Sequence, residues 1–303
     1  MEHDLEDRVL GCIVGGAIGD ALGGPYEGQP GWVTLQPDVP WRLSDDTQLT
    51  LATCEAVCAS ASVSPASIAD HFVRWFRQGR ITGVGASTLK ALRDLAAGAH
   101  WALSGRKGER GAGNGAAMRI APLAFLLDPE CPEQRTILRD VSRITHHNDE
   151  AYVGALAVIV AVRAIVLGKW HADGNLPALV AEALPDTMVR ERLLAVSQLN
   201  PATPVWEVGR TFGCSGYVAE SVPLAIYAAQ RIGREGFQKV LHLAVEAGGG
   251  TDTIASITGQ ITGAAIGFSG IPPDLVNRLP ADEDVLLLAR NFASLVACGS
   301  SHR

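Results

Sequence analysis

Residues 252–267 read DTIASITGQITGAAIG, a stretch in which glycine recurs every four positions. Gly259, Gly263 and Gly267 are spaced i, i+4 and i+8, so on a helix they form one smooth stripe that lets a neighbouring helix approach closely. Helix pairs in membranes use the same spacing, but the Thr and Gln residues in between favour a contact inside a soluble bundle. The stretch therefore predicts a helix packed at short distance against another helix.

Helical spacing of apolar residues continues through the rest of the chain, whereas the alternation typical of strands is hard to find. Gly, Pro, Asn or Asp bounds each expected helix. The expected helices cover about 5–22, 47–60, 65–78, 83–97, 115–127, 133–144, 149–167, 175–184, 187–197, 204–212, 215–231, 235–246, 252–267 and 283–297. Because no linker-like segment divides them, the sequence predicts an all-α fold in a single domain over residues 1–303.

The composition limits the classes of partner. The chain has 303 residues and a formal net charge of −7, from 25 Lys and Arg against 32 Asp and Glu. A general attraction to nucleic acid or to an anionic membrane is therefore not expected. The apolar stretch 151–167 is short for a membrane span and contains Arg163, so we expect it to be a buried helix.

The N-terminus and the cysteines indicate a cytoplasmic protein. The first eight residues, MEHDLEDR, are acidic where a secretory signal is basic and then apolar. The six cysteines, at positions 12, 54, 58, 131, 214 and 298, form no CxxC pair. We interpret them as reduced core thiols, with disulfides or a zinc site as the alternative.

Two short acidic motifs each come directly before an apolar helical stretch. They are Ser44–Thr47 (SDDT) and Thr251–Thr253 (TDT). Helix capping explains one such motif, since these side chains accept the free N–H groups of a first helical turn. Two adjacent carboxylates exceed what capping needs, and the second motif repeats the chemistry far along the chain. Carboxylate and hydroxyl oxygens suit Mg²⁺ or Mn²⁺ rather than zinc, so a cation site at two converging helix starts is the other interpretation.

A glycine-rich run, GGAIGDALGGPYEG, covers residues 15–28. It is similar to a dinucleotide-binding fingerprint, but no β-branched strand precedes it, so we favour a closely packed helix that Pro25 ends. Asp20 lies inside this helix among apolar residues, where an unpaired carboxylate would be costly. Glu27 follows on a loop, a suitable place for an acid–base or metal-gating carboxylate.

Two further motifs contain candidates for ligand contacts. Residues 113–119, GNGAAMR, open a predicted helix, and glycines in such a place expose N–H groups that can cradle a diphosphate. An ordinary turn with an Asn cap explains this motif equally well. In residues 145–149, THHND, the adjacent histidines point in different directions, so we do not expect them to form a paired metal site. We expect one of them to form a hydrogen bond with a ligand or with a capping group.

Taken together and in this order, the motifs resemble the ADP-ribosylglycohydrolase family. The matching stretches span residues 11–268 and read GAIGDALGGPYEG, SDDTQLTL, GNGAAMRIAP, THHNDEAYVGA, GYVAESVPLAIY and GGGTDTIASITGQITGA. The resemblance implies a compact, orthogonal multi-helix bundle with two divalent cations, Mg²⁺ or Mn²⁺, in an ADP-ribose cleft. It also implies a metal-dependent hydrolase that releases ADP-ribose from a modified protein side chain or small molecule. Nucleic acid enters only as a possible ADP-ribosylated substrate, and no membrane partner is expected.

The resemblance also implies roles for individual residues. Metal binding falls on Ser44, Asp45, Asp46, Asp252 and Thr253, with Asp252 as the bridge between the ions. Catalysis falls on Glu27, Asp46 and Asp252, and Glu27 matches the mobile-loop glutamate of the family. Ligand binding falls on Asn114, Gly115, Ala116, Met118, His146 and Gly249.

The chain departs from the family pattern at one position. Relatives typically read GGDTDT where residues 248–253 read GGGTDT, so Gly250 stands in place of a metal-binding aspartate. Loss of a carboxylate is expected to weaken one ion site. Two hypotheses follow: an active hydrolase, and an ADP-ribose-binding protein with weak or no hydrolase activity.

Overall fold

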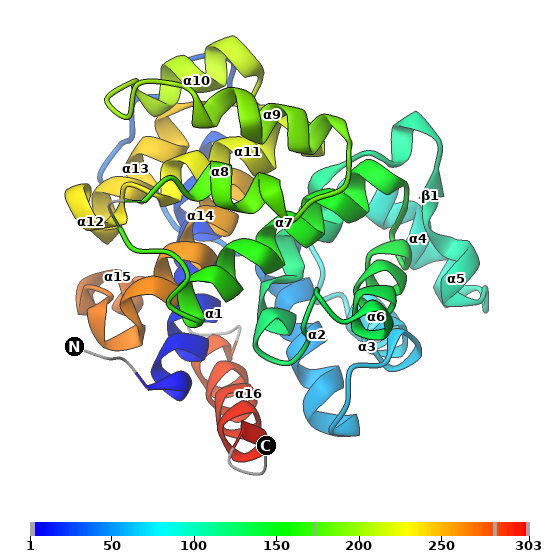
Figure 1. The fold of residues 1–303 in the computed structure, drawn as a ribbon. Coiled ribbons are helices and arrows are strands. Elements are labelled where there is room, and N and C mark those ends of the chain that lie inside the picture. Colours follow the sequence, from blue (N-terminus) through cyan, green and yellow to red (C-terminus); the bar gives the residue numbers. More distant parts are fainter. Residues whose placement is uncertain (1–3, 173, 281–283, 301–303) are drawn as a thin grey trace.

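The computed structural model describes residues 4–172, 174–280 and 284–300, and these are mostly helical (Figure 1). The α-helices are α1 (Leu5–Gly23), α2 (Asp45–Ser60), α3 (Pro65–Arg77), α4 (Ala86–Ala96), α5 (Trp101–Ser104), α6 (Pro132–Arg143), α7 (Asp149–Val166), α8 (Leu176–Glu182), α9 (Met188–Ser197), α10 (Val205–Phe212), α11 (Val218–Ala229), α12 (Ile232–Glu235), α13 (Phe237–Glu246), α14 (Thr251–Ile266), α15 (Pro273–Asn277) and α16 (Val285–Ser300). The 3₁₀ helices are η1 (Gly24–Tyr26), η2 (Glu109–Gly111), η3 (Asn114–Arg119), η4 (Ala121–Phe125) and η5 (Phe268–Gly270). Strands β1 (Arg106–Lys107) and β2 (His146–His147) form one short parallel pair. The predicted all-α fold is confirmed.

Helices α1 and α14 form an antiparallel pair at the centre of the molecule (Figure 1). A methyl group added at Gly15 would lie 2.3 Å from the carbonyl oxygen of Gly259, and one added at Gly23 would lie 2.3 Å from that of Thr251. Side chains there would force the helices apart, so glycine sets the spacing. The predicted tight contact is confirmed, and it brings the last turn of α1 to the first turn of α14.

The other helices pack around this pair. α2, α11, α13 and α16 contact α1 or α14 or both, while α9 and α10 cover α11 at one end of the molecule (Figure 1). Of the described helices, α1 with η1 (Leu5–Tyr26) is the one long and apolar enough to cross a membrane, and 78% of its apolar window is buried in the protein.

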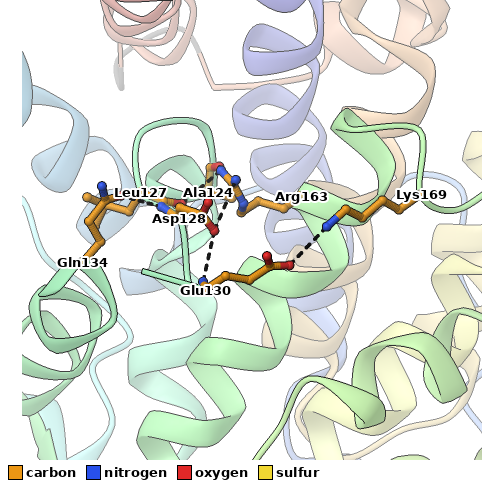
Figure 2. Close-up of polar contacts among 7 residues, drawn as sticks. All are labelled: Ala124, Leu127, Asp128, Glu130, Gln134, Arg163 and Lys169. Atoms are coloured by element: carbon orange, nitrogen blue, oxygen red, sulfur yellow. Dashed lines mark hydrogen bonds and ion pairs between the residues drawn. The ribbon is translucent and has the colours of Figure 1, made fainter. Parts of the chain in front are cut away.

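Helix α7 is the buried helix predicted around residues 151–167, and its charged residue has partners. Arg163 Nη1 donates hydrogen bonds to the carbonyl oxygens of Ala124 (3.3 Å) and Leu127 (3.1 Å). Its Nη2 lies 3.4 Å from Asp128 Oδ1 (Figure 2). The guanidinium thus connects α7 to the end of η4. Its charge is compensated by these partners, so the apolar face of α7 stays buried.

The predicted α-helix over 115–127 is wrong, because this segment is divided into η3 and η4. Pro122 has no N–H to donate to the carbonyl of Met118, and its ring disfavours an α-helical residue before it. The Met118 carbonyl instead accepts a hydrogen bond from Gln260 Nε2 at 2.5 Å. The carbonyl group that an α-helix would have used internally therefore forms a hydrogen bond to α14.

The six cysteines are all unpaired in the structure. Cys12 and Cys54 are buried in the core as predicted. Cys58, Cys131 and Cys214 are only partly buried and Cys298 is exposed, so the prediction of core thiols is wrong for these four. Their positions near helix ends and loops account for the difference.

Candidate active site

Three helix termini converge on one group of carboxylates. The α1–α14 packing brings Asp20 beside Asp252, and α2 begins at the same place with Asp45 and Asp46. One carboxylate oxygen from each of Asp20, Asp46 and Asp252 lies within 4.8 Å of the others. The two acidic motifs that are distant in sequence are therefore adjacent in space.

Asp20 is the buried carboxylate that fixes the start of α2. It accepts hydrogen bonds from the backbone N–H and hydroxyl of Ser44 (3.0 and 2.8 Å) and from those of Thr47 (3.2 and 2.6 Å). Four donors compensate the burial of this side chain. The sequence assignment of metal ligands omitted Asp20, although a carboxylate inside an apolar helix is itself a signal of a paired or metal-binding group.

Hydroxyl groups orient the neighbouring Asp46. Ser44 caps α2, and its Oγ lies 3.3 Å from Asp46 Oδ2, while Thr253 Oγ1 donates to the same Oδ2 at 3.2 Å. The other oxygen, Asp46 Oδ1, is buried with no hydrogen-bond partner in the described parts of the chain. A buried carboxylate oxygen left without a donor is what a hard cation would bind, so the donor set fits Mg²⁺ or Mn²⁺.

The electrostatics of the carboxylates also favour a cation. Burial raises the pKa of Asp20 to about 6, against the lowering effect of its hydrogen bonds to Thr47 and Ser44. Burial, and after it the charge of Asp252, raise the pKa values of Asp45 and Asp46 well above the usual range. A bound divalent cation would neutralise this mutual repulsion.

Glu27 lies at the mouth of the site on a loop that Gly249 holds in place. Partial burial of its carboxyl, followed by the charge of Asp252, raises the pKa of Glu27 to about 8. Gly28 N–H donates to Gly249 O, and Gly249 N–H donates to Gln29 O, both at 2.9 Å. Gly249 has φ of +73°, and a methyl group there would lie 2.0 Å from the Cys214 carbonyl oxygen. Only glycine fits this position.

A cavity of about 260 Å³ separates the carboxylates from the glycine-rich loop before and within η3. The site residues proposed from sequence that line it are Glu27, Asp45, Asp46, Asn114, Gly115, Met118, His146, Asp252 and Thr253. The structure thus gathers most of the candidates around one cleft. The backbone of the loop is held by a hydrogen bond from Asn114 N–H to Gly216 O at 3.0 Å.

Three candidates lie outside the lining of this cavity. Ser44 faces Asp20 and Asp46, Ala116 is fully buried behind the loop, and Gly249 supports the Glu27 loop. The sequence assignment also omits two lining residues: Thr88, which lies in no motif, and Gly216, which begins the matching stretch GYVAESVPLAIY but is given no role there.

Comparison with known proteins places the chain in a family. A family model described as ADP-ribosylglycohydrolase matches residues 1–300. The chain belongs to the ADP-ribosylglycohydrolase family. The resemblance seen in the ordered motifs is therefore confirmed.

This ADP-ribosylglycohydrolase is similar to proteins with named activities. It is 27% identical over 302 residues to "ADP-ribosylarginine hydrolase Tri1" of Pseudomonas putida (strain GB-1), and the alignment covers 94% of this chain and 78% of the relative. It is 25% identical over 299 residues to "ADP-ribosyl-[dinitrogen reductase] glycohydrolase" of Rhodospirillum rubrum, with 91% of each chain covered. A solved structure titled "ADP-ribosylglycohydrolase-related protein complex" superposes with a TM-score of 0.74 at 29% identity, covering 96% of this chain and 99% of that one. The chain is therefore an ADP-ribosyl hydrolase, an enzyme of the glycosidase class.

Gly250 lines the cleft of this hydrolase, and the backbone does not require glycine there. Its φ is −78°, and a methyl group would have its nearest neighbours at 3.7 Å, the Cys214 oxygen and the Ser215 carbonyl carbon. The backbone therefore leaves room for a Cβ atom at this position. The comparisons give no support to the alternative that Gly250 makes the chain a binding protein only.

Proposed function

We propose that this enzyme depends on two divalent cations, Mg²⁺ or Mn²⁺, and cleaves the N- or O-glycosidic bond between ADP-ribose and its acceptor. The observation that carries the proposal is the convergence of Asp20, Asp46 and Asp252, with Asp46 Oδ1 left without a donor, in a cleft that also contains the 113–115 loop. The acidic side suits cations and the distal ribose, and the loop side suits the diphosphate.

The acceptor class is a modified protein side chain, in keeping with the names of the arginine and dinitrogen reductase hydrolases to which the chain is similar. A small molecule or an ADP-ribosylated nucleic acid is a second source of the same ADP-ribose group. The cytoplasmic location and the lack of a membrane partner stay predictions of the sequence.

The cations would be held by Asp45, Asp46, Asp252 and Thr253, together with the neighbouring Asp20. Ser44 has a different proposed role from the one that the resemblance implies, because its hydroxyl orients Asp20 and Asp46. When bound, the cations supply Lewis acidity toward the ribose hydroxyls and toward water.

The protein's own residues position the groups that react. In the reaction, the bond from the anomeric carbon to the acceptor atom breaks and a water oxygen bonds to that carbon. Asp46 and Asp252 stabilise the positive charge that develops on the sugar. The Glu27 carboxyl, at the mouth of the cleft beside Asp252, is placed to transfer a proton between water and the departing acceptor or to gate the cleft.

A panel of substrates tests the proposal. ADP-ribosylated arginine, serine and nucleic acid are incubated with the enzyme in Mg²⁺, in Mn²⁺ and in chelator, and free ADP-ribose is measured. Release from at least one substrate with metal, and its loss in chelator, is expected. Equal release in chelator would refute the metal dependence, and binding of ADP-ribose without release from any substrate would refute hydrolysis of these linkages.

A further inference from the structure

Arg119 is a buried cation without a counter-charge among the residues that the structure describes. Its side chain is fully buried and lies 4.8 Å from the ring centre of Phe72. Nη2 donates to Val141 O at 3.1 Å and to Thr145 Oγ1 at 3.0 Å. Nε and Nη1 have no hydrogen-bond partner there, and no described carboxylate forms an ion pair with the guanidinium. Burial of an unpaired charge is costly, so this group suggests that an anion binds nearby.

Thr145 connects Arg119 to His146. Thr145 is fully buried, and its Oγ1 accepts from Arg119, which can only donate. The hydroxyl proton must go elsewhere, and the acceptor within reach is His146 Nδ1 at 2.9 Å. If the hydroxyl donates to Nδ1, the proton of the neutral imidazole resides on Nε2.

The Nε2 edge of His146 faces the cleft. A methyl group at Gly113 would lie 3.1 Å from Nε2, and one at Gly115 would lie 2.7 Å from Cε1. His146 lines the cavity with these two residues, and in the described residues Nε2 has no hydrogen-bond partner. The histidine therefore presents a free N–H donor beside the glycine-rich loop.

We propose that Arg119 is a positioning residue that acts through Thr145 to fix His146 as an Nε2–H donor for a phosphate group of the ligand. The inference rests on the proposed function, since the phosphate is taken to be part of the diphosphate of ADP-ribose. Arg119 also supplies positive charge behind the donor, in a chain whose net charge is −7. The glycines at 113 and 115 leave room for the imidazole at the floor of the cleft.

The first measurement reads the tautomer directly and needs neither ligand nor metal. Nitrogen-15 spectra of the histidine side chains, with the His146→Gln variant for assignment, are recorded for the full chain near neutral pH. The wild type and Thr145→Ser should show His146 protonated at Nε2, because both retain the hydroxyl. Thr145→Val, which keeps the shape without the proton donor, should shift His146 toward the Nδ1–H form.

The second measurement reads the contact with phosphate. Calorimetry compares ADP-ribose with adenosine, which lacks phosphate. Thr145→Val should weaken ADP-ribose binding roughly tenfold or more, as expected for loss of an aligned donor to a charged group, and should leave adenosine binding unchanged. Thr145→Ser should bind both as the wild type does. Arg119→Met should repeat the Thr145→Val pattern, and if it does not fold, the Thr145 pair still decides the question.

An unchanged tautomer and unchanged ADP-ribose affinity in Thr145→Val would overturn the inference. A fall in ADP-ribose affinity equal to the fall in adenosine affinity would also overturn it, because it would show a general structural defect. Both outcomes are separate from a failure of the proposed function, which would appear as no release of ADP-ribose by the wild-type enzyme from any substrate.

Discussion

The two sides of the cleft are built in different ways. The acidic wall, made of Glu27, Asp45, Asp46 and Asp252 with the buried Asp20 behind them, lies at the end of one helix and the starts of two others. The loop wall, made of residues 113–115, Met118 and His146, lies on 3₁₀ turns and a two-residue strand. The acidic wall is positioned by the packing of helices against one another. The loop wall is positioned by hydrogen bonds to segments that are distant in the sequence.

The difference shows how one small cleft can bind opposite charges. Burial, and after it repulsion between the carboxylates, raises the pKa values of Asp20, Asp45 and Asp46, and a bound cation would relieve this repulsion. On the other wall, burial and then the charge of Arg119 lower the pKa of His146 to about 3, so this ring stays neutral. The acidic wall therefore suits a cation, and the loop wall, with Arg119 behind it, suits an anion.

Removal of a carboxylate from the acidic wall should have the largest effect. Asp252→Ala should lower the rate of ADP-ribose release by more than about 100-fold, since even residues behind a metal ligand contribute 10- to 100-fold. It should also abolish the rise in melting temperature that metal produces by binding the folded state. The control is Asp274→Ala, an exposed aspartate in the first turn of α15. Full activity of Asp252→Ala with metal would contradict the assignment.

A change in the packing that supports the acidic wall should come next. Gly15→Ala should destabilise the protein by about 1–3 kcal/mol, because the methyl group meets the backbone of Gly259 at 2.3 Å and outweighs any gain in helix propensity. Gly299→Ala on α16, where a methyl group meets nothing within 4 Å, is the matched control. Denaturant unfolding measures both variants, and equal stability would show that α1 and α14 are not packed this closely.

A carboxylate added to the same wall should have a moderate effect. A Cβ at position 250 meets no atom closer than 3.7 Å, and Gly250→Asp should lower the metal concentration for half-maximal activity by roughly tenfold, with Gly250→Ala as the control for loss of glycine. Metal titrations of activity check this. If both variants have the same metal dependence as the wild type, position 250 does not contribute to metal binding.

The smallest expected effect is on the pH dependence of stability, to which the two walls contribute with opposite signs. In metal-free protein, folded Glu27 with a pKa of about 8 takes up a proton that the unfolded chain does not, so stability rises as pH falls from about 9 toward 6.5. His146 acts in the opposite sense below about 6.5, where the unfolded chain binds a proton that the folded one excludes.

Melting temperatures measured across this pH range test both signs. Glu27→Gln should flatten the upper part of the curve, and His146→Gln should reduce the loss of stability at the acid end. Saturating Mg²⁺ should remove the Glu27-dependent rise. If the melting temperature of the metal-free wild type decreases as the pH is lowered from 9 to 6.5, the raised pKa of Glu27 is contradicted.

The acidic wall could largely be predicted from sequence because its signals are local. Ser44 caps α2 and the TDT motif opens α14, so the helix starts were correctly placed within two residues. The sequence marks Asp20 as a costly buried group but does not indicate that it belongs to the cluster. Its four donors from Ser44 and Thr47 depend on how α1 lies against α2, which no local pattern encodes.

The loop wall could be predicted only in part. The GNGAAMR motif located the loop, but periodicity predicted an α-helix where Pro122 forces 3₁₀ turns. Arg119 ends this motif, but the motif does not indicate its position behind His146, because that position results from a contact with Thr145, which is 26 residues away in the sequence. Local motifs thus identify candidates, while their connections depend on tertiary packing.

The most direct test of a cleft with two walls is the affinity for ADP-ribose with and without metal. Calorimetry of the wild-type enzyme should show that ADP-ribose binds more tightly than AMP, because it carries the diphosphate for the loop wall and the distal ribose for the acidic wall. Saturating Mg²⁺ or Mn²⁺ should strengthen ADP-ribose binding and leave AMP binding unchanged. Equal affinity for the two ligands, or an ADP-ribose affinity that does not respond to metal, would contradict the account.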